Sequence, residues 1–282
     1  MGLVEAVILG AVQGITEFLP VSSSGHLVLL QKILGISEPA LLFDTMVHVG
    51  TLGAVFVVLW KDIWAILRRP VQPLTGFLIL ATLPAVIIAL VFRDFIEEAF
   101  QSGAWLGFAF IFTAAALFVS ERLSGRAGKP PALSPKLRPP GSMNWPDAAV
   151  IGMLQGIAII PGVSRSGLTL SGALSRKLDR DFAARFSFLL SIPAILGALV
   201  LQLKDLAGSG PAGGEIGSAG TSGGIGWAPM IAGTLTAAVV GFFSVRLMLR
   251  IVRERSLRGF AVYTAVLGIL VLADRYGSHL FF

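Results

Sequence analysis

The sequence predicts an all-α polytopic membrane protein, with six transmembrane helices plus two re-entrant broken-helix hairpins in an inverted-topology repeat. Three observations predict this fold class. Of the 282 residues, 55% are hydrophobic and only 13% are charged, whereas soluble domains carry about 25% charged residues. Several apolar runs are long enough to cross a hydrocarbon core of about 30 Å. Two similar polar stretches, half a chain apart, interrupt apolar segments.

Six apolar runs have the length of full spans: residues 39–60, 73–92, 103–120, 183–203, 227–249 and 259–276. Two further apolar segments, 3–35 and 144–176, are each interrupted near the middle by a polar break rich in Ser and Gly. A helix, a break and a helix that returns to its starting side would suit both segments. Such re-entrant backbone is tolerated at membrane depth only where it lines a cavity or is buried in protein.

The basic residues predict the orientation of these spans. Most of the 22 lysines and arginines fall at one side of the predicted topology, in residues 61–72, 121–143, 176–185, 246 and 250–258. Cytoplasmic loops carry the excess of basic residues, so both termini are expected outside. The Gly-rich segment 207–226 is expected to be an outer loop. Because the lysines and arginines lie in loops between membrane spans, the sequence does not predict a surface that binds nucleic acid.

An internal repeat relates the two breaks. "QGITEFLPVSSSGH" (13–26) and "QGIAIIPGVSRSGL" (155–168) agree at seven of fourteen ungapped positions. Each copy precedes three spans, and an odd number of spans inverts the second copy. We therefore expect a first repeat over 1–122, a cytoplasmic Pro-rich linker over 123–143, and an inverted second repeat over 144–282. Inverted repeats with broken helices place their sites near the midplane, so the two breaks should meet.

The first break carries Glu17, three serines (Ser22, Ser23 and Ser24) and His26, and the second carries Ser164, Arg165, Ser166, Gly167 and Thr169. A charge at the centre of a membrane helix costs about 2.5–3.5 kcal/mol on insertion scales. A simple ion pair between Glu17 and Arg165 would account for the charges but for neither the hydroxyls nor the histidine. Free N–H groups at helix N-termini, beside Ser and Gly, suit an oxyanion. The planar guanidinium matches phosphate, so the breaks predict an anion site.

Ser23 or Ser22 could act as a nucleophile with His26, which follows three or four residues later and could face the same space. Glu17 could orient His26, accept a proton, or hold a divalent cation. Phosphoryl hydrolysis and transport of an anion both stay open at this point, because a transporter also binds its anion. The absence of cysteine excludes thiol chemistry.

Asp44 and His48 lie four residues apart within an apolar run and would share a helix face. Ionisable groups inside a membrane are candidates for function. Hydrogen bonding within the bundle, or solvation of Asp44 near the interface, are the alternatives.

"QGITEFLPVSSSGH" and "PGVSRSGLTLSG" closely resemble the two signature stretches of the undecaprenyl-diphosphate phosphatase family, also called bacitracin-resistance proteins. The resemblance extends over nearly the whole chain in length, span pattern and motif placement. It implies an enzyme of the bacterial plasma membrane that removes the terminal phosphate of undecaprenyl diphosphate. The product is the monophosphate carrier lipid of cell-wall synthesis. A transporter or flippase for a phosphorylated prenyl lipid is the alternative.

The resemblance also implies a site open to the periplasmic or outer face, with activity supported by a divalent cation, Mg²⁺ or Ca²⁺. By position, it makes Glu17 an essential carboxylate and metal ligand, Ser23 the nucleophile, and His26 and Arg165 essential. The choice among serine, histidine and water as the attacking group stays open, as does formation of a homodimer. The residues expected to bind substrate are Gln13, Ser22, Ser24, Asp44, Ser164, Ser166, Gly167 and Thr169. Gln13 stands where many members carry a second glutamate, and its neutral side chain weakens a two-carboxylate metal clamp.

Overall fold

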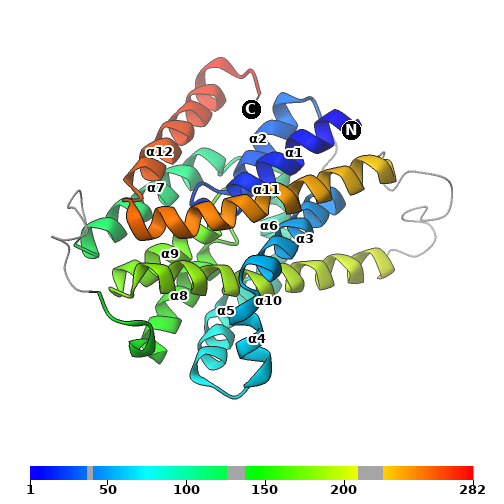
Figure 1. The fold of residues 1–282 in the computed structure, drawn as a ribbon. Helices are drawn as coiled ribbons and strands as arrows, with labels where there is room; N and C mark the ends of the chain where they lie inside the picture. The colour runs from blue at the N-terminus through cyan, green and yellow to red at the C-terminus, as the bar shows by residue number, and fades with distance from the viewer. Residues whose placement is uncertain (37–40, 126–136, 209–224, 282) are drawn as a thin grey trace.

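The computed structural model describes residues 1–36, 41–125, 137–208 and 225–281. These residues are almost entirely helical (Figure 1), and one isolated bridge joins the described residues Arg138 and Leu178. The all-α prediction is confirmed for this part of the chain. Much of the predicted Pro-rich linker and of the predicted Gly-rich outer loop lies outside the described residues.

Twelve α-helices occur in the described residues. They are α1 Leu3–Thr16, α2 Ser23–Ile33, α3 Leu41–Val58, α4 Trp60–Arg68, α5 Pro73–Val91, α6 Arg93–Ser102, α7 Leu106–Leu123, α8 Trp145–Ile157, α9 Arg165–Ser175, α10 Arg180–Gly208, α11 Trp227–Glu254 and α12 Arg258–Ala273. Short turns follow at η2 Pro140–Ser142 and η3 Asp274–Ser278.

Five helices in the described residues are long and apolar enough to cross a membrane: α5, α7, α10, α11 and α12. A sixth span exists if α3 and α4, which meet at a 78° bend, are counted together. The chain is therefore a multi-pass membrane protein with five or six candidate spans.

The predicted loop over 61–72 is wrong in part, because α4 occupies its first residues. Exposed Trp60 and Trp64 stack on each other with ring centroids 5.6 Å apart, while Ile63 is buried. Three of the other six residues of this short helix are charged: Lys61, Asp62 and Arg68. Such an amphipathic segment suits the membrane interface, which explains why the chain bends after α3 and stays helical. The amphipathic α6 was likewise not predicted.

Both predicted helix–break–helix segments are present. Residues 17–22 separate α1 from α2, and residues 158–164 separate α8 from α9. In both segments a serine caps the second helix: the Oγ of Ser22 accepts a hydrogen bond from the Gly25 amide (3.2 Å), and the Oγ of Ser164 accepts one from the Gly167 amide (3.0 Å). The repeated sequence thus forms the same side-chain cap twice, since a side-chain oxygen replaces a missing backbone acceptor.

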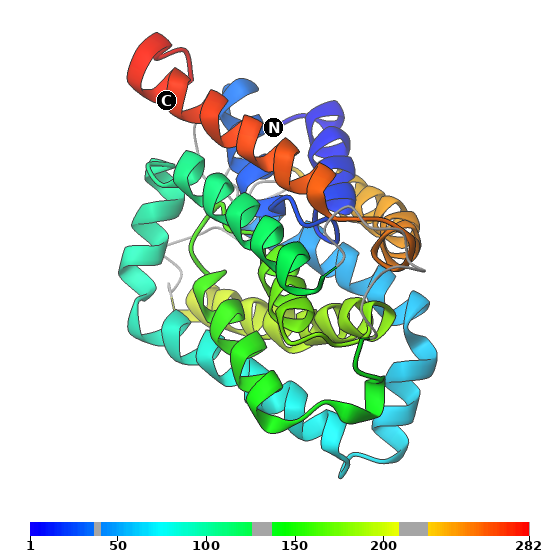
Figure 2. The ribbon, with the colours of Figure 1, turned by 90° about the vertical axis from the view of Figure 1, so that its left-hand side faces the viewer.

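Each hairpin packs against a long helix of the other half of the chain. Helix α1 lies along α11, and α8 lies along α5, while α7 and α12 pair with each other (Figures 1 and 2). Glycines allow the close approach: a Cβ atom added to Gly10 would lie 2.3 Å from the carbonyl oxygen of Gly233. Phe18, in the first break, is buried and packs edge-on against Phe188 of α10. These contacts hold the two breaks next to each other.

A second polar cluster ties several helices together away from the breaks. Glu121 of α7 is fully buried and accepts hydrogen bonds from Arg180 Nη2 (2.6 Å) and the Leu257 amide (3.1 Å). Arg180 also donates from Nε to the Val252 carbonyl (2.6 Å). Arg180 was expected in a basic turn, but it is only 4% exposed. The ion pair between Glu121 and Arg180 therefore connects the turn between α11 and α12 to α7 and α10.

Candidate active site

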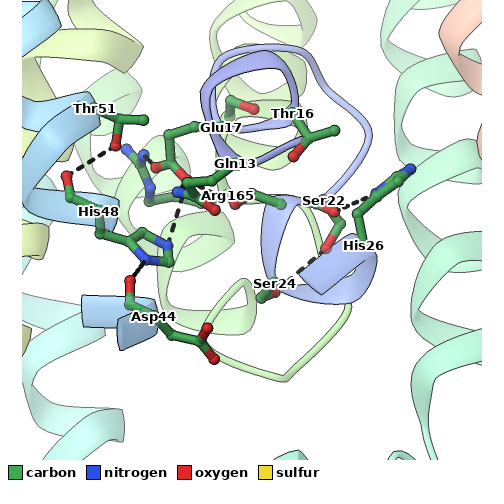
Figure 3. A network of polar contacts seen from close by, with 12 residues as sticks. Gln13, Thr16, Glu17, Ser22, Ser24, His26, Asp44, His48, Thr51 and Arg165 are labelled. Atoms are coloured by element: carbon green, nitrogen blue, oxygen red, sulfur yellow. Dashed lines mark hydrogen bonds and ion pairs between the residues drawn. The ribbon is translucent and has the colours of Figure 1, made fainter. Parts of the chain in front are cut away.

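The two breaks meet, as the repeat predicted. Ser166, at the start of α9, donates from Oγ to the carbonyl of Leu19 in the first break (3.0 Å). Arg165 forms an ion pair with Glu17, through Nη2 and Oε1 (Figure 3). Residues almost 150 positions apart in the sequence therefore share one site.

Glu17 is the centre of this site. Its side chain is only 3% exposed, and it accepts hydrogen bonds at Oε2 from Ser23 Oγ (2.6 Å) and Gln13 Nε2 (2.8 Å). His48 Nε2 lies 3.4 Å from the same oxygen, and Arg165 contacts the other. A buried carboxylate is tolerated only where it is paired and hydrogen-bonded. Glu17 meets both conditions.

The hydroxyl of Ser23, the expected nucleophile, lies beside a carboxylate. Ser23 is the first residue of α2, and its hydroxyl donates to Glu17 rather than to its own helix. A nucleophile within 2.6–3.2 Å of a base is the arrangement that covalent catalysis needs. Ser22 has a different task, since its Oγ caps α2 and the residue is 2% exposed. Ser24 Oγ lies 3.4 Å from Ser22 Oγ and accepts a bond of the same length from the Gly162 amide.

Arg165 has an unused donor. Its Nη1 atom is buried and has no hydrogen-bond partner among the described residues, while Nη2 is held by Glu17. An orphaned guanidinium nitrogen is costly unless a ligand completes it, and a phosphate oxygen is the matching acceptor. The α9 N-terminus begins at the same residue, so its dipole favours the same anion.

A cavity of about 350 Å³ opens over these groups. Its polar wall includes Glu17, Ser23, His48, Ser164, Arg165 and Ser166. Its apolar wall comes from α2 and α10, through Leu27, Val28, Ala194 and Ile195. A cavity lined by both charged and apolar side chains suits an anionic head group that carries an apolar chain.

The remaining predicted residues of the second break support the site from behind. Ser164 is 1% exposed; it caps α9 and donates its amide to Thr113 Oγ1 (3.0 Å). Thr169 is fully buried and bonds to the Arg165 carbonyl (2.8 Å) and to Ser187 Oγ (2.5 Å). A Cβ atom on Gly167 would lie 3.0 Å from Ser164. Thr169 and Gly167 therefore shape the α9 terminus without lining the cavity.

Asp44 and His48 share a helix face, as predicted, and both line the cavity. Asp44 accepts from Gln31 Nε2 (2.7 Å), and its carbonyl accepts from His48 Nδ1 (2.6 Å). That bond leaves His48 Nε2 facing Glu17. Both residues were candidates by their sequence, but only Asp44 was expected to bind substrate. The four-residue spacing from Asp44 was the only signal for His48.

His26 does not face the cavity. Its Nδ1 donates to the Ser22 carbonyl (2.6 Å), and its Nε2 lies 2.7 Å from the hydroxyl of Tyr263. Figure 3 shows the ring pointing away from Glu17 and Arg165. The expectation that His26 shares a space with the serine nucleophile is therefore wrong in geometry. The Ser23 hydroxyl turns back toward the break, whereas the imidazole extends toward α12.

The expected divalent cation finds few ligands. In the part of the chain that the structure describes, no group of three or more His, Cys, Asp or Glu side chains could hold a metal ion. Both oxygens of Glu17 already face donors, one of them a guanidinium. Mg²⁺ and Ca²⁺ need six or more oxygen ligands, so these residues do not fit a cation held by the protein alone.

Known proteins resemble this chain over almost its whole length. The family described as "Bacitracin resistance protein BacA" matches residues 6–270. Undecaprenyl-diphosphatase of Carboxydothermus hydrogenoformans is 45% identical over 273 residues, covering 96% of this chain and 97% of that protein. Undecaprenyl-diphosphatase 4 of Bacillus thuringiensis is 41% identical, covering 98% of each chain. Undecaprenyl-diphosphatase of the more distant Methanosphaera stadtmanae is 36% identical, covering 96% of this chain and 98% of that protein.

Proposed function

The chain belongs to the family of bacitracin resistance protein BacA, and we propose that it is an undecaprenyl-diphosphatase. It hydrolyses undecaprenyl diphosphate to undecaprenyl phosphate and orthophosphate in the membrane, and so recycles the carrier lipid of cell-wall synthesis. The observation that carries this proposal is the contact of Ser23 with Glu17, directly beside the unpaired Nη1 of Arg165.

The reaction begins at Ser23. Its Oγ attacks the terminal phosphorus while the hydroxyl proton passes to Glu17 Oε2, which lies 2.6 Å away. The bond between that phosphorus and the bridging oxygen breaks, and its electron pair stays on the leaving undecaprenyl phosphate. Water then hydrolyses the phosphoserine and releases orthophosphate. The geometry favours serine over His26 as the attacking group, because both ring nitrogens of His26 are engaged elsewhere.

Arg165 and the α9 N-terminus neutralise the phosphoryl group during this transfer. Phosphoryl transfer depends mainly on positioning and on charge stabilisation. Nη1 of Arg165 binds a phosphate oxygen, while the bond from Nη2 to Glu17 fixes the plane of the guanidinium. Gln13 donates to Glu17 from the other side, and His48 Nε2, 3.4 Å from the same oxygen, donates as well when both ring nitrogens are protonated. The catalytic carboxylate and the phosphate-binding cation therefore come from opposite halves of the chain.

The divalent cation stays a prediction. Because Glu17 is the only carboxylate in contact with both Ser23 and Arg165 among the described residues, we expect any Mg²⁺ or Ca²⁺ to be held mainly by the oxygens of the diphosphate. The homodimer stays a prediction as well.

We infer an inverted repeat with both termini outside and the cavity open to the periplasmic or outer face. The exchanged packing supports the repeat: α1 of the first half lies on α11, and α8 of the second half lies on α5. The basic residues support the orientation through the positive-inside rule.

Release of orthophosphate from a prenyl diphosphate by the purified protein in detergent tests the proposed function. Wild-type protein is expected to release phosphate, and Ser23→Ala is expected not to. A lipid carrier would need an anion site but no serine hydroxyl bonded to a carboxylate, so this contact favours hydrolysis over transport. Head-group translocation in liposomes that survives Ser23→Ala, without phosphate release by the wild type, would instead support a carrier.

A further inference from the structure

His26 lies in an environment that uses both of its ring nitrogens. Nδ1 contacts a carbonyl oxygen, that of Ser22, at 2.6 Å. A carbonyl only accepts hydrogen bonds, so Nδ1 carries the hydrogen. The neutral ring then presents a lone pair at Nε2, which accepts the hydroxyl hydrogen of Tyr263 at 2.7 Å. Neither nitrogen is left to exchange a proton with substrate.

The ring is also fixed on its faces and edges. It stacks on Tyr263 with centroids 5.8 Å apart and an interplanar angle of 11°, and it meets Phe110 edge-on at 5.5 Å. His26 is 8% exposed and does not line the cavity. The imidazole is therefore packed as a rigid bridge between the first break and α12.

The atom at the other end of this bridge belongs to a strained residue. Ser22 has φ 72° and ψ 97°, and non-glycine residues rarely adopt a positive φ. Strain of this kind persists only where the surrounding structure over-determines it. The bond from His26 Nδ1 to the Ser22 carbonyl supplies one constraint, and the cap from Ser22 Oγ to Gly25 supplies another. The next residue is Ser23.

We infer that His26 is a positioning residue that holds the Ser22 carbonyl, and that Tyr263 of α12 is the anchor that orients His26. The expected effect on kcat rests on the proposed function. The chain of contacts runs from Tyr263 through His26 to Ser22, and it sets the direction in which the Ser23 hydroxyl points at Glu17. Misplacement of a reacting group by about 1 Å can cost about 100-fold in rate, so an anchor remote from the phosphate can control kcat.

Two amide substitutions at His26 separate positioning from proton transfer. In His26→Asn, the amide nitrogen takes roughly the place of Nδ1 and can still donate to the Ser22 carbonyl. In His26→Gln, the longer side chain carries its amide nitrogen toward the place of Nε2. The Ser22 carbonyl then keeps only the backbone amide of residue 26, 3.2 Å away, and loses its side-chain donor. We expect kcat to fall about three- to tenfold in His26→Asn and about 100-fold in His26→Gln, with KM little changed in both. If His26 transferred a proton, both would lose about 100-fold or more alike. Equal, large losses would therefore overturn the inference.

Tyr263→Phe removes only the hydroxyl and keeps the stacked ring. We expect kcat to fall about three- to tenfold, and no further fall when the substitution is added to His26→Asn, because the two act through one bond. Tyr276→Phe is the matched control: it is the same change at the only other tyrosine of the sequence, in an exposed turn. Full activity of Tyr263→Phe, or additive losses in the double variant, would contradict the anchor.

A readout without turnover keeps this test separate from the proposed function. Amide hydrogen exchange over residues 22–27 is expected to speed up in Tyr263→Phe and to stay unchanged in Tyr276→Phe. If the wild-type protein released no phosphate, the proposed function would be contradicted. The exchange rates would still test whether Tyr263 anchors His26. Unchanged exchange in Tyr263→Phe would overturn that inference.

Discussion

The hydroxyl oxygen of Ser23 lies 2.6 Å from Oε2 of Glu17, across the break that separates α1 from α2. The same carboxylate pairs with Arg165 from the second break. One buried glutamate therefore connects the proposed nucleophile, in the first half of the chain, with the arginine proposed to bind phosphate, in the second half. The predictions that follow test this connection and the packing that maintains it.

Replacement of Ser23 by alanine removes the attacking oxygen. We expect kcat for phosphate release to fall by about 1,000-fold or more, since loss of a covalent nucleophile removes a whole reaction route. Ser24→Ala is the neighbouring comparison, because Ser24 lines the cavity but does not contact Glu17. A loss in Ser24→Ala equal to that in Ser23→Ala would argue against a special role for Ser23.

Arg165→Lys keeps the charge but removes the planar fork. A lysine cannot reach Glu17 and a phosphate oxygen with two fixed nitrogens, so we expect kcat/KM to fall about 100-fold. Steady-state kinetics, with elution from a sizing column as a check of folding, measure this. Wild-type kcat/KM in the lysine variant would mean that the unused Nη1 has no part in binding phosphate.

His48→Asn tests a candidate residue that was not expected to bind substrate; the shorter amide can replace Nδ1 but does not reach Glu17. The variant loses the contact between His48 Nε2 and Glu17, so the carboxylate is held less firmly against Ser23. We expect a fall of about tenfold in kcat with a smaller effect on KM. An unchanged kcat would show that Gln13 and Arg165 suffice to position Glu17.

Gln13→Glu tests the cation prediction. The substitution would place a second carboxylate next to Glu17, where Gln13 Nε2 now lies 2.8 Å from Oε2. Two carboxylates make a better ligand set for a hard cation than one. We expect the variant to reach half-maximal activity at a lower Mg²⁺ or Ca²⁺ concentration than the wild type, measured by titrating the cation after treatment with a chelator. Identical titrations would indicate that the cation does not contact this position.

Glu121→Gln tests the buried ion pair that connects the turn between α11 and α12 to α7 and α10. The substitution leaves Arg180 buried without its counter-charge, and breaking a buried pair in this way costs about 3–5 kcal/mol. We expect a lower melting temperature in detergent. Glu254→Gln is the control, because this carboxylate pairs with Arg250 and Arg253 at the surface and its loss should leave the melting temperature unchanged. Equal melting temperatures in the two variants would contradict this role of the ion pair.

The sequence predicted those parts of the site that depend on local pattern. Glu17 and Arg165 lie in two copies of one motif, and two copies of a broken helix place their polar residues at one interface. The capping serines, Ser22 and Ser164, follow from the same motif. These features need only the repeat and the chemistry of helix termini.

The other parts depend on the rotation and register of separate helices. Whether His26 or His48 faces Glu17 depends on how α2 and α3 turn about their axes, which apolar spans alone do not specify. Tyr263 contacts His26, although the two residues are 237 positions apart in the sequence. It lies in an apolar segment whose pattern predicts a membrane-spanning helix. The bend before α4 and the burial of Arg180 likewise result from packing with partners remote in the sequence.

The most direct test of the central claim is to trap the reaction intermediate. Purified protein is mixed with a prenyl diphosphate labelled in its terminal phosphate and quenched within one turnover. The modified residue is then identified by mass spectrometry of peptides. We predict an acid-stable phosphoryl group on Ser23 that is absent in Ser23→Ala. An acid-labile phosphohistidine, or turnover of Ser23→Ala at the wild-type rate, would contradict the account.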